Sequence, residues 1–397
     1  MCSTEEDKDE MIRGRKPQPA ITCCKCESPP FVRIRRGDPF CKACFDTFVL
    51  HKFRQGLGKT KILYPDERVV LDLSGNLSSM TMLQLMSSAY DKAAHKKMTA
   101  VPLVVIIDES NLYDVGESVV PALLRTIKSC TDMPITTFIV PYEMILLEDF
   151  ETRFGKFYAQ HNTDNVVDFN EVTDISDLTA KSKLLLSNID NLTAREDLHR
   201  SLRIQLLYRM AKLLNSCKIM LTQTSVELAA HLLTTLSVGK GSSIPFETSY
   251  LDTRTKDVTF INCMRDFTPK ECAYYLKLKG VAPLTVIQPG TLCDPYVGSI
   301  SRLTSTFVSG LQADFPSTVS TILRTGNKLG ATYGTASCLI CMVPLTSSKY
   351  EEGDEYCNGC MVTLSEAQRS INLLPSFTKR CTEEEVLNEY LIDETER

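Results

Sequence analysis

The sequence contains no long hydrophobic run. Its longest apolar stretch, Val101 to Ile107, is far shorter than the roughly 20 residues that a helix needs to cross a bilayer. The first residues are polar and acidic, and they lack the apolar segment of roughly 7–15 residues that marks a secretory signal. We therefore expect a cytoplasmic protein without a membrane-spanning segment.

A large charge excess is also absent, because the formal net charge is −5. This value does not indicate a nucleic-acid-binding protein as a whole. The charge is uneven, however. Residues 25–61 hold nine Lys or Arg and three acids, a net charge of +6, whereas residues 5–10 and 382–397 are acidic. This pattern favours local contact with an anionic partner.

A disulfide framework is not expected for the sixteen cysteines, because the cytosol keeps thiols reduced. Eight of them form four C-x2-C pairs, in two quartets. The quartets are Cys23, Cys26, Cys41 and Cys44, and Cys338, Cys341, Cys357 and Cys360. Four thiolates at these spacings predict a structural zinc ion at each quartet. An iron–sulfur cluster is the alternative at either quartet, and Cys24 is an alternative ligand in the first.

Basic residues accompany the first quartet. Three lie between its two pairs and three follow it: Arg33, Arg35, Arg36, Lys52, Arg54 and Lys59. They can form a surface that contacts RNA phosphates, or simply a solvated charged face. The neighbouring metal module favours the RNA interpretation.

Strand and helix patterns alternate between the quartets. Strands are expected at Val69–Leu73, Leu103–Ile107, Ile135–Val140 and Lys218–Thr222, and helices at Met80–Lys97, Val119–Ile127, Ala194–Asn215 and Ser225–Leu236. One more strand–helix unit is expected within Phe260–Leu292, with Pro269 at the helix start. This order predicts a parallel sheet with helices on its faces.

Three local features refine this expectation. Ser225 is expected to cap its helix, and the methionines between Met80 and Met86 are expected in the core. The polar stretch Glu151–Asn191 is predicted to be an insertion or a long loop.

The predicted segments are a disordered acidic tail at 1–20, a four-cysteine zinc module at 21–61, an α/β domain at 65–333, a C-terminal zinc ribbon at 334–365 and an acidic tail at 366–397.

A Gly- and Ser-rich turn follows the first strand and opens a helix. Ser74, Gly75, Ser78 and Ser79 are candidate phosphate contacts there, because backbone N–H groups and the helix dipole attract anions. No Lys-Ser or Lys-Thr pair follows the glycine, so the turn is not a Walker loop.

This turn resembles the SGGxDS-like loop of the PP-loop ATP pyrophosphatases. Within that group the chain resembles the cytoplasmic tRNA 2-thiolation protein 2 family over most of residues 21–365. The stretches that carry the resemblance are Cys23–Cys44, His51–Lys59, Val69–Met82, Leu221–Gly241, Met264–Phe267 and the terminal quartet. The resemblance implies a Rossmann-like parallel sheet of PP-loop type, flanked by an N-terminal zinc module and a C-terminal zinc ribbon.

The chain departs from the pattern of the catalytic relatives at reactive positions. Asn76 stands at the second glycine of the loop, and Ser78 stands where an acid is expected. The relatives' C-x-x-C pair falls near Glu196 and His199, and their His-x-x-Asp-Asp stretch reads Gln223–Glu227. We therefore expect ATP binding that is weakened or lost, and no catalytic residues.

The resemblance implies the non-catalytic subunit of a heterodimeric thiolase for the wobble uridine (mcm5s2U) of the tRNAs for lysine, glutamate and glutamine. It implies that the catalytic subunit uses ATP and sulfur from a thiocarboxylated ubiquitin-related modifier, while this chain binds tRNA and stabilises its partner. One alternative is an independently active PP-loop ATP-dependent tRNA-modifying enzyme. Another is a zinc-dependent interaction protein without an RNA role.

Other candidate residues have weaker support. Sulfur relay is one interpretation of Cys217, Cys263, Cys272 and Cys293, but lone cysteines on apolar segments are more often small buried hydrophobes. His199 and His231 are candidate bases, although histidines without an identified partner are more often structural. Asp108 ends a strand at the expected ligand edge of the sheet, where it meets a nucleotide or caps the next turn.

Overall fold

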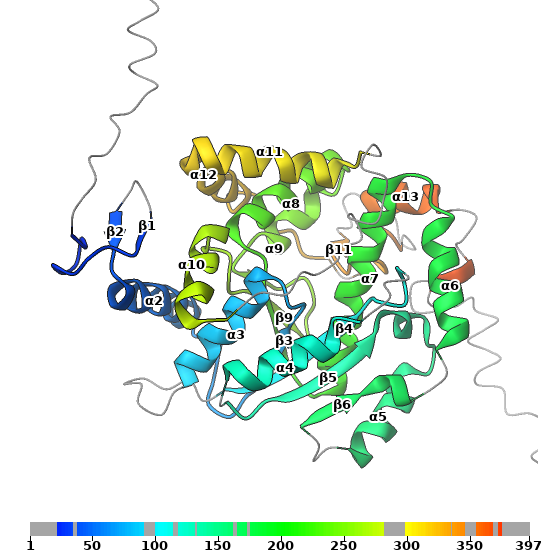
Figure 1. Ribbon diagram of the computed structural model, residues 1–397. Coiled ribbons are helices and arrows are strands. Elements are labelled where there is room, and N and C mark those ends of the chain that lie inside the picture. Colours follow the sequence, from blue (N-terminus) through cyan, green and yellow to red (C-terminus); the bar gives the residue numbers. More distant parts are fainter. Residues whose placement is uncertain are drawn as a thin grey trace, which may run out of the picture.

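The computed structural model describes residues 22–34, 38–90, 100–113, 118–131, 133–161, 165–172, 175–281, 298–334, 336–345, 355–367 and 372–374. Among these residues, seven strands form a central sheet in the order β6-β5-β4-β3-β7-β9-β8 (Figure 1). The strands are β3 (Arg68–Asp72), β4 (Val101–Asp108), β5 (Thr136–Pro141), β6 (Val166–Asp168), β7 (Lys218–Leu221), β8 (Leu251–Asp252) and β9 (Thr259–Asn262). Every pair is parallel except β8 with β9.

The apolar runs of the strands explain this sheet. Val69 and Leu71 of β3 enter one core cluster and Val70 enters another, because successive side chains point to opposite faces of a strand. All three side chains are fully buried. A strand that is apolar on both faces suits a parallel sheet that is covered on both sides.

Helices cover both faces of the sheet. One core cluster joins the sheet to α2 (Lys42–Thr60), α3 (Leu77–Tyr90), α4 (Val120–Cys130) and α10 (Pro269–Lys279). The other joins it to η2 (Tyr142–Leu146), α5 (Phe150–Gln160), η3 (Phe169–Glu171), α6 (Ser176–Ser187), α7 (Leu192–Leu213) and α13 (Asn358–Glu366). Together with the parallel sheet, these layers confirm the predicted α/β fold.

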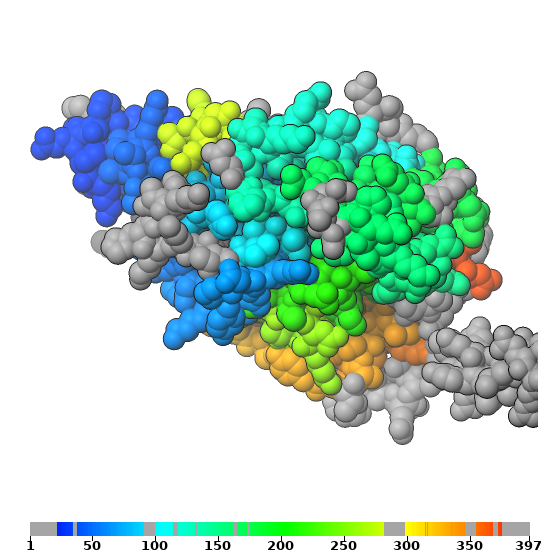
Figure 2. Space-filling model, turned by 90° about the horizontal axis from the view of Figure 1, so that it is seen from below, coloured from blue at the N-terminus to red at the C-terminus, as the bar shows by residue number. Residues whose placement is uncertain are grey.

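A third cluster packs α8 (Ser225–Ser237) against α11 (Ile300–Asp314) and α12 (Pro316–Gly326). Two short turns, η4 (Gly241–Ser243) and α9 (Ile244–Glu247), follow α8. Each cysteine quartet is accompanied by a hairpin, made by β1 (Val32–Ile34) and β2 (Asp38–Phe40) or by β10 (Ala336–Ser337) and β11 (Pro344–Leu345). Figure 2 shows the N-terminal module at one end of the molecule, beside α10. In the part of the chain described, no helix has the length and apolar character needed to cross a bilayer.

The predicted strands and helices before residue 150 and from 192 to 279 lie within a few residues of the observed ones. The exception is the predicted end of one helix at Lys97, because α3 is described to Tyr90 and residues 91–99 lie outside the described part of the chain. The methionines at 80, 82 and 86 are buried, as expected. Of the two alternatives for 151–191, an insertion or a long loop, the loop is wrong, because this stretch holds α5, β6 and α6. Its aromatic residues build a local core, in which the rings of Phe154 and Phe169 lie 4.3 Å apart.

Two further differences concern helices. The N-cap of α8 is Thr224, not Ser225, and Thr224 forms a capping box with Glu227. Two helices, α11 and α12, lie where the sequence analysis predicts none. Both helices are amphipathic and pack on α8 through Val308, Val319 and Leu323, so a helical period was present in this stretch and the sequence analysis overlooked it.

A buried carboxyl group lies in η2, just after β5. The side chain of Glu143 is fully buried, and neither of its carboxyl oxygens has a hydrogen-bond partner among the described residues. Burial raises the pKa of this carboxyl to about 7, and the negative charges of Asp108 and Glu109 add to the effect. The group is therefore protonated in the folded protein at pH values where it ionises in the unfolded chain.

We predict that Glu143→Gln removes a pH-dependent penalty on stability. Between pH 4.5 and 7 the folded state keeps a proton that the unfolded state releases, so stability falls as the pH rises through this range. Above pH 7 the penalty reaches about 3 kcal/mol. The Gln variant should therefore gain stability over the wild type at pH 8 and little at pH 5, as measured by chemical unfolding. Glu148→Gln, at an exposed position of the same segment, is the matched control. Equal gains by the two variants at pH 8 would contradict the prediction.

Candidate functional site

A large cavity lies at the carboxyl ends of β3, β4 and β7, and its volume is about 780 Å³. Strand order reverses at β3 in this sheet, and ligands of open α/β sheets bind at such a reversal. Helices α7, α8 and α11 form the other walls, and the turn after β3 forms part of the floor. The cavity is thus the position of a nucleotide site in the fold.

The turn after β3 satisfies its own donors. Gly75 has a φ of +81°, a conformation that glycine adopts readily. The next residue, Asn76, precedes α3, and its Oδ1 accepts hydrogen bonds from Ser79 N at 2.8 Å and Ser78 Oγ at 3.1 Å. Ser79 Oγ donates to the Asn76 carbonyl at 3.1 Å. Side-chain and backbone oxygens of the protein therefore occupy donors that an anion needs at a helix N-terminus.

The serines of this turn have different positions. Ser74 lines the cavity, while Ser78 and Ser79 are buried. Their hydroxyls are used within the first turn of α3. Of the four candidate phosphate contacts, Ser74 and Gly75 lie in the turn itself, and the two buried serines lie behind it.

An ion pair crosses the cavity floor. Arg203 of α7 donates two hydrogen bonds to Asp72 at the end of β3, at 2.7 and 3.0 Å. Its Nε donates to Glu109 Oε1 at 3.2 Å. Burial disfavours the charge on Arg203, but the two carboxylates outweigh burial and raise its pKa further. An internal cation therefore balances part of the negative charge at this edge of the sheet.

The positions aligned with the relatives' cysteine pair carry out structural roles. Glu196 accepts a hydrogen bond from Ser299 Oγ at 2.7 Å and pairs with Arg302 Nε at 3.2 Å, which ties α7 to α11. His199 is buried, stacks on Tyr142 with ring centroids 4.7 Å apart, and lies 3.6 Å from Glu109. Burial lowers the pKa of His199, against the effect of Glu109. Within the described residues no cysteine lines the cavity.

Residues of the Gln223–Glu227 stretch stabilise the start of α8. Gln223 Oε1 accepts a hydrogen bond from Arg200 at 3.1 Å, and Thr224 and Glu227 form the capping box. Asp108 accepts hydrogen bonds from Ser110 N and Ser118 Oγ, at 3.0 and 2.9 Å, so it organises the turn after β4. It also lines the cavity.

The remaining candidates lie apart from one another. His231 pairs with Glu247. Cys217 is exposed, whereas Cys263 and Cys272 are buried, and burial raises the pKa of the Cys272 thiol to about 12. Cys293 lies outside the described residues. Among the described residues, Cys217, Cys263 and Cys272 belong to no group of potential metal ligands.

Both quartets form compact sulfur clusters. Within each, all four sulfur atoms lie within 4.8 Å of one another. Individual sulfur–sulfur distances are 3.5 Å for Cys26 with Cys41 and 3.6 Å for Cys341 with Cys357. Four sulfurs on a tetrahedron around zinc, with Zn–S bonds near 2.3 Å, lie about 3.8 Å apart. Both clusters therefore have the donors and spacing to bind a metal ion, and Cys24 belongs to neither.

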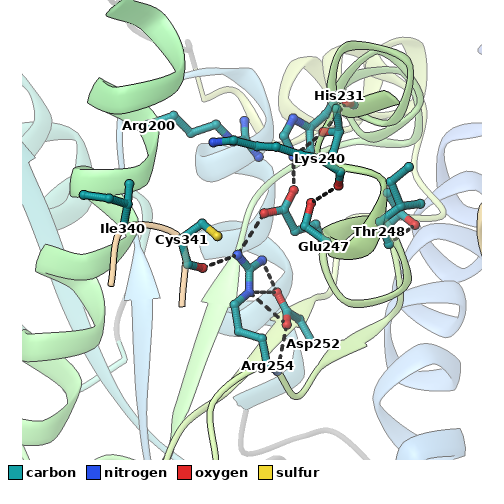
Figure 3. A network of polar contacts seen from close by, with 12 residues as sticks. Arg200, His231, Lys240, Glu247, Thr248, Asp252, Arg254, Ile340 and Cys341 are labelled. Atoms are coloured by element: carbon teal, nitrogen blue, oxygen red, sulfur yellow. Dashed lines mark hydrogen bonds and ion pairs between the residues drawn. The ribbon is translucent and has the colours of Figure 1, made fainter. Parts of the chain in front are cut away.

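The C-terminal cluster is fixed to the α/β core. Gln205 of α7 donates to the carbonyl of Leu339 at 2.7 Å, and Arg254 donates to the carbonyl of Cys341 at 3.2 Å. Figure 3 shows Arg254 between Glu247 and Asp252. In the same region Lys240 pairs with Asp197, which also accepts a hydrogen bond from Thr363 of α13 at 2.8 Å.

The basic candidates of the N-terminal module are not equivalent. Lys52 pairs with the buried Glu271 of α10 at 2.7 Å, so its ammonium group joins two helices. Arg33 on β1 and Arg54 on α2 are half-buried, and Lys59 is exposed. Arg35 and Arg36 lie outside the described residues.

Sequence reasoning missed Arg203, Glu109 and Arg254. One signal was present, because Asp72 ends an apolar strand and a buried carboxylate requires a partner. The partner itself lies 131 residues away, and no local pattern connects the two.

Comparison with known proteins gives a consistent picture. Residues 299–389 match the sequence profile of the family described as Cytoplasmic tRNA 2-thiolation protein 2. The chain is 31% identical to Cytoplasmic tRNA 2-thiolation protein 2-A of Xenopus laevis, over 87% of this chain and 77% of that protein. It is 29% identical to Cytoplasmic tRNA 2-thiolation protein 2 of Homo sapiens, over 95% of this chain and 83% of that protein. Its fold is similar to the U34-tRNA thiolase NcsA of Methanococcus maripaludis, solved with its [4Fe-4S] cluster. That similarity has a TM-score of 0.57 at 16% identity and covers 89% of this chain and 97% of that one.

We predict that Arg203→Met destabilises the protein by about 3–5 kcal/mol, because it leaves the buried carboxylate of Asp72 unpaired. Adding Asp72→Asn should recover much of this loss. The control is Arg153→Met, which breaks the exposed pair with Asp149 and should cost less than about 1 kcal/mol. Chemical unfolding of the four proteins measures these differences. A loss at Arg203 no larger than at Arg153 would show that the pair does not stabilise the sheet edge.

Proposed function

Because the chain belongs to the cytoplasmic tRNA 2-thiolation protein 2 family, we propose that it is the non-catalytic subunit of a cytoplasmic tRNA thiolase. In this proposal it pairs with a catalytic subunit and acts on the wobble uridine (mcm5s2U) of the tRNAs for lysine, glutamate and glutamine. The catalytic subunit uses ATP and takes sulfur from a thiocarboxylated ubiquitin-related modifier. This chain binds tRNA and stabilises its partner.

The observation that carries the proposal is the state of the cavity. Its position and size suit a nucleotide, but Asn76 caps the helix at the phosphate position. Six carboxylates and three guanidinium groups line it, an excess of negative charge that repels a triphosphate. Among the described residues no cysteine lines the cavity, so none of these residues offers a thiol to carry sulfur there. These features support a subunit with weakened or absent ATP binding and speak against an independently active enzyme.

The N-terminal module supplies the proposed contact with tRNA. Arg33 and Lys59, with Arg35, Arg36 and Arg54, lie in a segment of net positive charge, and phosphate contacts of this type dominate the affinity for RNA. We do not include Lys52, because its ammonium group is engaged by Glu271.

We predict that the isolated chain does not thiolate tRNA when ATP and a sulfur donor are supplied, and that its co-purified complex with the catalytic subunit does. The measurement is mass spectrometry of 2-thiolated uridine in the nucleosides from each reaction. Ser74→Ala in this chain should leave the activity of the complex unchanged, since in this proposal the catalytic subunit binds the ATP that is used. Turnover by the isolated chain would instead establish the independently active enzyme.

We further propose that the two sulfur clusters hold zinc, with their four cysteines as ligands. Closed sites of four thiolates are typical of structural zinc, and bound metal would fix β1 and β2 against α2 and the C-terminal hairpin against α7. The predicted content is therefore two zinc ions per chain.

Elemental analysis of the purified complex tests this content. Changing Cys338 and Cys357 to serine should remove one zinc ion, because a two-ligand site binds weakly, and should lower the thermal unfolding midpoint. Cys24→Ser is the matched control and should retain both ions, since Cys24 lies outside the cluster. Iron in place of zinc, with visible absorbance, would contradict the assignment.

A further inference from the structure

Positive charge is concentrated on three helices that follow one another across one side of the molecule. Helices α2 and α10 and the segment 316–334, which begins with α12, contain nine Lys or Arg and two acids. Their net charge is +7 in a chain whose formal net charge is −5. The rest of the chain must therefore carry a net charge of −12. An asymmetry of this size is the electrostatic signature of a polyanion-binding surface.

Both acids on these helices are neutralised by a lysine of the neighbouring helix. Lys52 of α2 pairs with Glu271 of α10 at 2.7 Å, and Lys279 of α10 pairs with Asp46 of α2 at 2.8 Å. The lysine belongs to α2 in the first pair and to α10 in the second, and both pairs hold the two helices together. They leave no free acid on α2, α10 or residues 316–334.

Helix α12 joins this surface through the turn before α10. Arg265 donates to Asn327 Oδ1 at 2.9 Å and to the Leu323 carbonyl at 3.5 Å. Two residues further on, Phe267 lies under the Lys52 ammonium group, 4.7 Å from the ring centroid. A continuous chain of contacts thus runs from α2 to the end of α12. Figures 1 and 2 show α10 beside the N-terminal module, and Figure 1 shows α12 on the same side.

Six cations of this surface are exposed and have no carboxylate partner among the described residues. They are Lys42, Lys59, Lys270, Lys277, Arg324 and Lys328. We define these six residues as the basic track. Helix α12 adds the exposed hydroxyl of Ser317, and such groups donate to phosphate oxygens. The hydroxyls of Ser320 and Thr321 donate to the Ser317 carbonyl instead.

We propose that the basic track is the tRNA-binding surface, which extends from the N-terminal module over α10 to α12. This inference rests on the proposed function and adds surface that the sequence-based prediction did not include. An RNA backbone is favoured over an acidic protein because α2, α10 and α12 expose no large hydrophobic side chain in their described parts. The exposed ones in residues 316–334 are Leu329 and Tyr333, and the Tyr333 ring packs against Phe246. Protein interfaces are anchored by such side chains, whereas phosphate contacts need only charge and hydrogen-bond donors.

The test neutralises the part of the track outside the N-terminal module. The variant changes Lys270, Lys277, Arg324 and Lys328 to alanine in the co-purified complex. The control changes four exposed cations elsewhere by the same net charge: Arg125, Lys128, Lys156 and Lys256. Binding of tRNA is measured from about 50 to 200 mM salt, together with the thermal midpoint and retention of the catalytic subunit.

The track variant should weaken tRNA binding at least about tenfold, and the slope of log affinity against log salt should become shallower by about 3. The control should keep the wild-type tRNA affinity and salt slope, and both variants should keep the wild-type thermal midpoint. Equal binding by the track variant and the control would overturn the inference and leave the proposed function intact. Loss of the catalytic subunit from the track variant would assign the surface to an acidic protein partner and also overturn it. Failure of the wild-type complex to bind tRNA would instead refute the proposed function.

Discussion

The ion pair between Asp72 and Arg203 fixes the centre of this structure. It joins the end of β3, where the strand order reverses, to the middle of α7. In a nucleotide-binding member of such a fold, bound ligand and cations balance the charges at this edge. Here the guanidinium group of Arg203 bridges Asp72 and Glu109, so folding itself supplies a cation at this edge and part of its negative charge is balanced without a ligand. The ion pair that stabilises the fold also occupies space and charged groups that a bound ligand would otherwise use.

Helix α7 connects this pair to the rest of the molecule. Arg203 faces the cavity floor, Gln205 holds the backbone of the C-terminal cluster, and Arg209 pairs with Glu151 of α5. The C-terminal module fits closely, because a Cβ atom at Gly359 would lie 2.1 Å from the Lys240 side chain. Binding of a metal ion at the C-terminal cluster would therefore affect the position of α7, which forms a wall of the cavity.

Local patterns allowed much of this to be predicted from the sequence. The strands were recognisable as short apolar runs, and the metal clusters were recognisable because the spacing of C-x2-C pairs is itself the signal. The capping role of Asn76 was not predicted, although it depends on residues only three positions apart. The Asp72–Arg203 pair could not be predicted, because it depends on how β3 and α7 meet. Helices α5 and α6 were missed because their stretch is rich in polar residues, although α5 buries Phe150 and Phe154 and α6 buries three leucines.

The distribution of charge relates the cavity to the proposed RNA surface. The cavity is lined by an excess of acids, while the basic track lies on helices whose own acids are paired. A polyanion approaching this chain is repelled from the cavity and attracted to α2, α10 and α12. A catalytic PP-loop protein needs the opposite arrangement, with its anion site open to substrate and ATP. Charge separation of this kind suits a subunit that holds RNA while the reaction takes place in another active site.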